Sequence, residues 1–249
     1  MKFISRLHLA RSQAGIGLIE LMIAMVLSLI IGAAVIQVFI SQRQTYRAQD
    51  DMSRVQENAR FAFEQIAQDI RQVGYWGCSR KASIVNETSD TAFNNVNDKA
   101  LIEVAAGLDL TFLNPQPVGA VGTANFTDST PPVRVVADCT NATIFKSNTV
   151  PGGFPVGSLI YELSSVRYSV ADGGLSRGGD NLIPSGVQSL GLRYGVASAA
   201  GWAETYQNAQ AVGSNWSSVV SVEVILTLRG EVVGEQVFKS VVAVRNRLP

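Results

Sequence analysis

The sequence is poor in the side chains that most enzymes use for acid–base chemistry and metal binding. Its only histidine is His8, and none follows in the rest of the 249 residues. The chain after His8 therefore cannot use a histidine as a catalytic base or as the activator of a serine or cysteine nucleophile. It also cannot bind zinc through histidine. The sequence also points to no pair of carboxylates for a glycosidase. We expect a protein that is not an enzyme and that binds no cofactor and no metal.

The sequence also lacks an excess of charge of either sign, and it contains few cysteines. Lys and Arg number 20, as do Asp and Glu, so the formal net charge is zero. Without a basic excess, nucleic acid is not expected as a main partner. The two cysteines, Cys78 and Cys139, are far apart in the sequence. In an oxidising compartment we expect one disulfide between them, and two free thiols in separate sites are the alternative.

One apolar stretch near the N-terminus stands out. A leader with three basic residues (Lys2, Arg6 and Arg11) precedes the sequence GIGLIELM at 15–22, and mostly apolar residues continue to Ile36 and on to Ile40. An ordinary secretory signal is cleaved after its apolar region. Here the small residue Gly15 comes before it, so cleavage there removes residues 1–15 and keeps the apolar segment.

The apolar segment has the length of a membrane span. At 1.5 Å per residue, a helix from Ile16 to Ile36 is about 31 Å long, which matches a hydrocarbon core of about 30 Å. We expect residues 16–40 to cross a membrane, with the basic leader on the cytoplasmic side and the rest of the chain on the exported side.

Glu20 is the one charged residue inside this segment. A carboxylate in hydrocarbon is costly and signals a function and a partner. The nearest candidate is the amine that cleavage creates on Ile16, in the same chain or in a neighbouring one. Pairing between chains would fix the axial register of stacked helices, as a buried polar residue does in a coiled coil. The alternative is a signal anchor with a protonated glutamate near the interface.

Residues 41–77 continue the helical pattern with a polar composition. One stripe of small and apolar residues recurs at spacings of three and four, and charged residues fall mainly on the other faces. We expect one helix from Ile16 to Val73 that packs on a sheet through this stripe, and two helices with a break at 41–43 are the alternative. Glycines and aromatics at 74–77 predict the helix end. The stripe consists of Val55, Ala59, Ala62, Ile66, Ile70 and Val73.

Residues 78–249 read as a β-rich head. Up to residue 157 the pattern predicts short strands with long loops, among them an excursion at 115–132. Beyond it, alternating patterns predict longer strands, hairpins at 171–174 and 230–234, and a loop at 202–216. The predicted strands are 108–113, 133–137, 159–170, 175–182, 187–194, 220–228 and a last one from Phe238.

Three further groups of side chains allow a functional interpretation beside a structural one. Asp172 and Asp180 lie near glycines, which suits either a calcium site or ordinary turns. On the helix, the acidic residues Asp50, Asp51 and Glu57 suit either contacts with other subunits or a solvated face. Trp202 and Trp216 suit either a partner-facing patch or ordinary packing.

The N-terminal pattern resembles the type IV pilin and pseudopilin superfamily. Gly15, Leu18, Ile19 and Glu20 match its hallmark, in which a leader ending in Gly is followed by an apolar start with Glu at the fifth mature position. The resemblance implies that prepilin peptidase cuts between Gly15 and Ile16 and methylates the new amine. Two positions depart from it: Ile16 stands where Phe or Met is usual, and Gly17 where Thr or Ser is usual.

A longer likeness is to the PilW family of minor pilins. It rests on the runs at 43–47, 54–62, 69–71 and 74–78, and on the segments 187–194 and 220–244, and it fades in the middle of the chain. It implies an α+β pilin fold, with a long N-terminal helix packed on an antiparallel sheet.

In function, the PilW likeness implies a minor pilin that is stored in the inner membrane with its head in the periplasm. It then primes pilus assembly and stays at the pilus tip on the cell surface. The expected partners are other minor pilins, the major pilin and prepilin peptidase. A J-type minor pseudopilin of type II secretion is the first alternative, and a membrane-anchored adhesin or binding module is the second.

Overall fold

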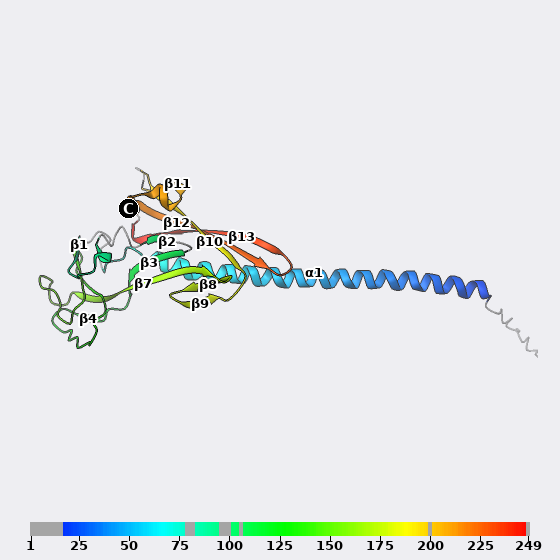
Figure 1. Ribbon diagram of the computed structural model, residues 1–249, viewed down its shortest axis with the longest axis horizontal. Coiled ribbons are helices and arrows are strands. Elements are labelled where there is room, and N and C mark those ends of the chain that lie inside the picture. Colours follow the sequence, from blue (N-terminus) through cyan, green and yellow to red (C-terminus); the bar gives the residue numbers. More distant parts are fainter. Residues whose placement is uncertain (1–16, 78–82, 95–100, 105–106, 199–200, 248–249) are drawn as a thin grey trace, which may run out of the picture. The chain divides into compact units, whose positions relative to one another are not determined.

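The computed structural model describes residues 17–77, 83–94, 101–104, 107–198 and 201–247. The chain forms two compact units, Met1–Asp50 and Asp51–Pro249. Helix α1 (Leu18–Gln72, 55 residues) runs through the boundary between them without interruption (Figure 1). The predicted single helix is therefore confirmed over its described length, and the alternative break at 41–43 is wrong.

The end of α1 is fixed by glycines and by the C-terminal segment. Gly74 and Gly77 have φ values of 78° and 79°, a left-handed conformation that stops a helix at little cost for glycine. The side chain of Asn246 donates hydrogen bonds to the carbonyls of Arg71 (3.0 Å) and Val73 (3.1 Å). These carbonyls have no partner within the helix, so Asn246 satisfies them.

Within the described residues, the larger sheet has nine strands. Its path is β1-β6-β5-β7-β3-β2, with β4 and β8 pairing to β7, and β9 to β8. All pairs are antiparallel except β1 with β6, which is parallel. The strands are β1 (Ser83–Asn86), β2 (Leu101–Val104), β3 (Gly107–Leu113), β4 (Gly119–Ala120), β5 (Arg134–Ala137), β6 (Asn141–Phe145), β7 (Leu159–Ala171), β8 (Gly174–Arg177) and β9 (Asp180–Ile183).

The smaller sheet has four antiparallel strands among the described residues, in the order β11-β10-β12-β13. They are β10 (Val187–Ala197), β11 (Ala203–Gln207), β12 (Val219–Gly230) and β13 (Gly234–Ala243). Short helical turns α3 (Ala209–Val212), η2 (Trp216–Ser218) and η3 (Arg245–Arg247) follow or precede them, and η1 (Thr91–Phe93) lies after β1.

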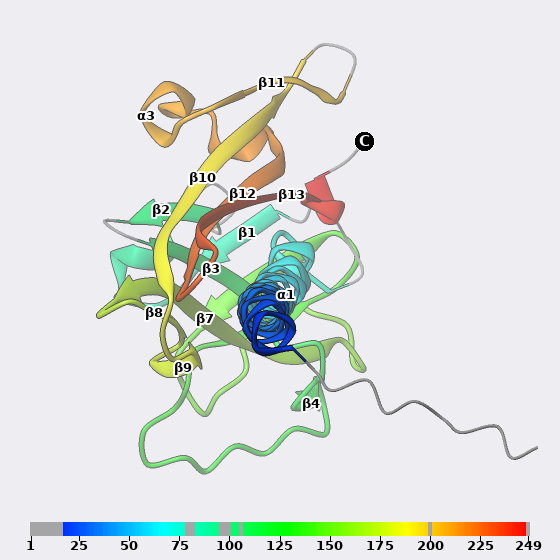
Figure 2. The same ribbon diagram turned by 90° about the vertical axis from the view of Figure 1, so that its right-hand side faces the viewer.

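The main core lies between α1 and both sheets. In Figure 2, β13 passes above α1, β10 and β12 lie on its left side, and β7 passes below it. All six residues of the predicted stripe are buried, and they belong to one cluster with residues of β3, β7, β10 and β12. The expected packing of the second half of the helix on a sheet is confirmed, and the structure adds a second sheet. Long β7 also reaches a separate cluster around Trp76.

Two segments differ from the sequence predictions. The predicted strand 175–182 is two strands, β8 and β9, because Gly178 and Gly179 adopt positive φ values of 62° and 96° and turn the chain. The predicted loop 202–216 contains β11 and α3, which local composition did not reveal. The hairpin at 171–174 is confirmed: Ala171 pairs with Gly174 across Asp172 and Gly173, both at positive φ.

Candidate functional site

The first half of α1 is an apolar surface whose side chains are exposed in the described structure. Every side chain from Leu18 to Arg47 is exposed, and nearly all of them are apolar as far as Ile40. Among the described residues, α1 is the one helix that is long and apolar enough to cross a membrane. A helix that is apolar on all faces requires lipid or other helices around it. This segment is the candidate functional site.

Glu20 lies in the first turn of this helix. Its backbone N–H donates to the carbonyl of Gly17 at 3.0 Å, and its side chain is exposed. A carboxylate in the first turn is favourable because the N-terminal end of a helix has a partial positive charge. The predicted cleavage residues Gly15 and Ile16 lie outside the described residues, so the pairing of Glu20 with the Ile16 amine stays a prediction.

The second half of α1 is locked to the head through Asp69, a residue that the sequence analysis missed. Asp69 is 3% exposed. Its carboxylate accepts hydrogen bonds from the Tyr168 hydroxyl (2.6 Å) on β7, and from Nε (2.8 Å) and Nη2 (3.0 Å) of Arg177 on β8. Burial raises the pKa of Tyr168, and the hydrogen bonds to Asp69 raise that of Arg177. The Tyr168 phenol therefore stays neutral and the Arg177 guanidinium stays charged at neutral pH.

Asp51 forms a second link between the helix and the head. Its carboxylate accepts hydrogen bonds from the backbone N–H groups of Val232 (2.7 Å), Val233 (3.0 Å) and Glu231 (3.2 Å) in the turn between β12 and β13. These hydrogen bonds lower the pKa of Asp51, and the bond from Val233 has the largest effect. The expectation of a solvated face is therefore wrong for Asp51, whereas Glu57 is exposed as expected.

Of the two cysteines, Cys139 lies among the described residues. Cys139 is exposed in the turn between β5 and β6, where Asp138 accepts backbone hydrogen bonds from Thr140 (2.7 Å) and Asn141 (2.6 Å). No cysteine among the described residues is a free thiol. Cys78 lies outside them, so the bond between Cys78 and Cys139 stays a proposal.

Of the other candidate residues, Asp172 and Trp216 have structural explanations, whereas Trp202 is exposed. Within the described residues, no group of three potential metal-ligating side chains occurs. Asp172, with φ 51°, forms the β7–β8 turn. Trp202 is 64% exposed, whereas Trp216 packs edge-on against Tyr194 with ring centroids 4.9 Å apart.

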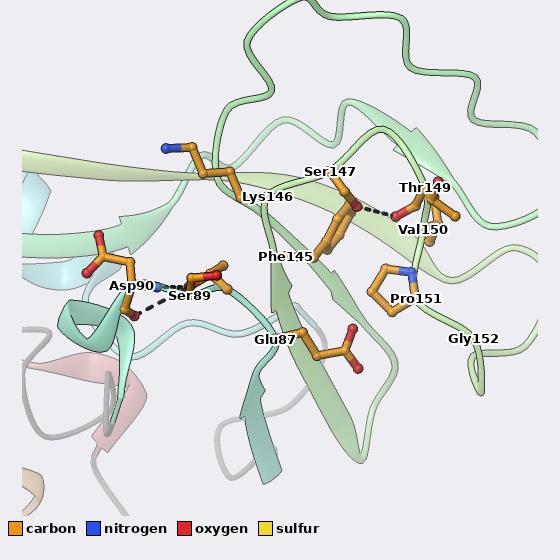
Figure 3. Close-up of a pocket in the computed structure, with 11 residues that line it drawn as sticks. Glu87, Ser89, Asp90, Phe145, Lys146, Ser147, Thr149, Val150, Pro151 and Gly152 are labelled. Atoms are coloured by element: carbon orange, nitrogen blue, oxygen red, sulfur yellow. Dashed lines mark hydrogen bonds between the residues drawn. The ribbon is translucent and has the colours of Figure 1, made fainter.

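A hollow of about 690 Å³ lies between the segment after β1 and the loop after β6 (Figure 3). Its polar groups mostly serve local turns: the Thr88 hydroxyl donates to Asn86 (2.6 Å), and the Ser147 hydroxyl donates to the Thr149 carbonyl (2.7 Å). Lys146 extends away from Glu87 in this view. The arrangement does not direct a set of polar groups at one ligand.

Comparison with known proteins supports the N-terminal interpretation. Residues 10–36 match the family described as the prokaryotic N-terminal methylation motif. No curated protein matches the chain, and no solved structure matches it either. The finer likeness to PilW rests on residues beyond the matched segment and stays a prediction. In the matched segment the chain is similar to the prepilins of the type IV pilin and pseudopilin superfamily, which are prepilin peptidase substrates and generally structural proteins rather than enzymes.

Proposed function

We propose that the chain is a PilW-like minor pilin that takes part in type IV pilus assembly. The observation that supports this most strongly is the helix surface from Leu18 to Ile40, which is apolar on all faces and exposed throughout. Lipid covers such a surface while the protein is stored in the inner membrane. Other pilin helices cover it after assembly, so the same segment serves both states.

In this proposal, prepilin peptidase cleaves between Gly15 and Ile16, and Glu20 fixes the register. The ammonium group of Ile16 in a neighbouring chain is the partner of the carboxylate, because an unpaired charge among packed helices is costly. The head, tied to α1 through Asp69 and Asp51, supplies the specific contacts with other minor pilins in a priming complex at the pilus tip.

The first experiment is mass spectrometry of the N-terminal peptide of the protein isolated from cells with and without prepilin peptidase. We expect a peptide that begins at Ile16, methylated or not, only when the peptidase is present. A leader that is retained in both strains, or cleavage beyond Ile40, would contradict the proposal, since the apolar helix would then belong to a signal segment.

Glu20 gives a prediction that separates cleavage from assembly. In the Glu20→Gln variant we expect normal cleavage but at least tenfold less protein in sheared surface filaments, because the amide keeps the size of the side chain and loses its charge. Gln37→Ala is the matched control, since Gln37 is another polar residue of the same exposed helix. Equal incorporation of both variants would show that the carboxylate has no role in register.

The methylation motif is common to pilins and pseudopilins, so cleavage does not distinguish the two machines. Deletion of the gene in a strain that has both a type IV pilus and a type II secretion system distinguishes them. Loss of surface pili with normal exoprotein secretion is expected for a minor pilin. The opposite pattern would assign the chain to a type II secretion system, and normal piliation with loss of adhesion would assign it to an adhesin.

A further inference from the structure

The charges along the first half of α1 are distributed very unevenly. Between Glu20 and Asp50 the only charged side chains are Arg43 and Arg47. The 20 residues Leu21–Ile40 between Glu20 and the arginines form a helix of about 30 Å, the thickness of a hydrocarbon core. The first arginine therefore follows the apolar segment by less than one helical turn.

The two arginines belong to a cluster on one side of the helix, which we call the interfacial cluster. Phe39, Gln42, Arg43, Tyr46 and Arg47 line a shallow groove there. The guanidinium of Arg43 lies over the ring of Phe39, 5.1 Å from its centroid, and Tyr46 is 72% exposed. Side chains on a helix lean toward its N-terminus, so both arginines lean back toward the apolar segment.

Arg43 and Arg47 lack a counter-charge among the described residues. Within the part of the chain that the structure describes, neither Arg43 nor Arg47 forms an ion pair. The next acidic residue, Asp50, has another interaction of its own. A guanidinium presents a planar set of donors that matches phosphate oxygens. Tyrosine is typical of the level of lipid headgroups, and a long arginine side chain near the end of an apolar helix reaches that level.

We propose that the interfacial cluster binds the phosphate of a lipid headgroup in the leaflet opposite the leader. Arg43 and Arg47 provide the charge and the hydrogen-bond donors, while Phe39 contacts the acyl boundary and Tyr46 lies among the headgroups. This site holds the helix at a fixed depth before assembly, and the lipid leaves when the helix enters a filament. The inference rests on the membrane span in the proposed function.

The test uses full-length protein in nanodiscs that contain equal amounts of phosphatidylglycerol and phosphatidylcholine. Native mass spectrometry measures the lipids that remain bound and their type. A basic side chain near an anionic membrane surface contributes about 1 kcal/mol, which is about fivefold in binding. We expect phosphatidylglycerol retention to fall about fivefold in Arg43→Gln and about 25-fold when Arg47→Gln is added.

Arg60→Gln is the control, because Arg60 is an exposed arginine of the same helix outside the cluster. We expect it to retain lipid like the unchanged protein, and a loss equal to that of the double variant would overturn the proposal. Carbonate extraction of membranes reports insertion separately: a protein that is extracted contradicts the membrane span itself. If the double variant is inserted and its lipid retention is unchanged, the lipid site is overturned but the membrane span is not. If that variant is also lost from filaments, the arginines pair with a neighbouring subunit instead.

Discussion

At the residue scale, two Asp–Arg pairs of similar geometry lie in different surroundings. Asp69 is buried, with its partner Arg177 36% exposed at the side chain, whereas Arg167 and Asp109 are 63% and 31% exposed. In both pairs the guanidinium donates two hydrogen bonds. Exposed pairs contribute little because water competes with them, and removal of a buried partner leaves polar groups unsatisfied.

We therefore expect Asp69→Asn to lower the free energy of unfolding by about 2 kcal/mol. The value is at the lower end for a buried pair, because Arg177 can regain water. Asp109→Asn is the matched control and should cost less than about 1 kcal/mol. Denaturant unfolding of the detergent-solubilised chain, followed by tryptophan fluorescence, measures both. Equal costs would show that burial does not matter at Asp69.

Asp51 predicts a pH dependence. Its pKa is lowered in the folded protein from 3.8, so the unfolded chain binds more protons between the two pKa values. Its stabilising contribution is complete above about pH 4 and is lost as the pH falls through the lowered value. We expect the unfolding midpoint to fall more steeply below pH 4 in the unchanged protein than in Asp51→Asn. Glu57→Gln, at an exposed position of the same helix, should leave the slope unchanged.

At the scale of the element, the buried stripe of α1 is what the helix uses to bind the head. Ile66 is fully buried at its centre, and Phe61 on the same helix is 46% exposed. We expect Ile66→Ala to cost about 2–5 kcal/mol, because it leaves a cavity between helix and sheets. Phe61→Ala, which removes a larger side chain, should stay within about 0.5 kcal/mol if exposure decides the outcome. A larger loss for Phe61→Ala would contradict the observed orientation of the helix.

Periodic elements were predictable because their signal is local. The stripe at spacings of three and four predicted the helix and its buried face, and the alternation from Val220 to Leu228 predicted β12. The two links between helix and head that the sequence analysis missed depend on distant contacts. Asp69 meets Tyr168 99 residues away, and Asp51 meets Val233 182 residues away. Nothing near either aspartate in the sequence distinguishes it from a solvated helix residue such as Glu57.

At the scale of the whole molecule, the proposed bond between Cys78 and Cys139 would close a large loop of the head. In the chain-entropy model a loop of this length corresponds to about 4 kcal/mol. We expect Cys139→Ser, or reduction with dithiothreitol, to lower the free energy of unfolding by up to that amount. Reduction of the Cys139→Ser variant is the control and should have no further effect. If reduction leaves the unchanged protein as stable as before, the two residues are not paired.

The part of the candidate site that could be predicted from sequence is the part that lies within the N-terminal motif. Residues 10–36 contain a pattern that is short, contiguous and rare, so the apolar helix and Glu20 could be named from sequence. The interfacial cluster could not be predicted from residues 43–47 alone, because its interpretation depends on the distance between Arg43 and Glu20 along one continuous helix. A break at 41–43 would have removed that relation.

The links between α1 and the head also determine how the molecule responds to force. Asp51 holds the β12–β13 turn, Asp69 holds β7 and β8, and Asn246 holds the last carbonyls of the helix. They are spread along the helix, so tension on its N-terminal end acts on them in shear, together with the buried stripe. Links loaded together resist rupture better than links that open one after another. In the proposed role as a pilus subunit, the chain would transmit traction through its helix while its head stays folded.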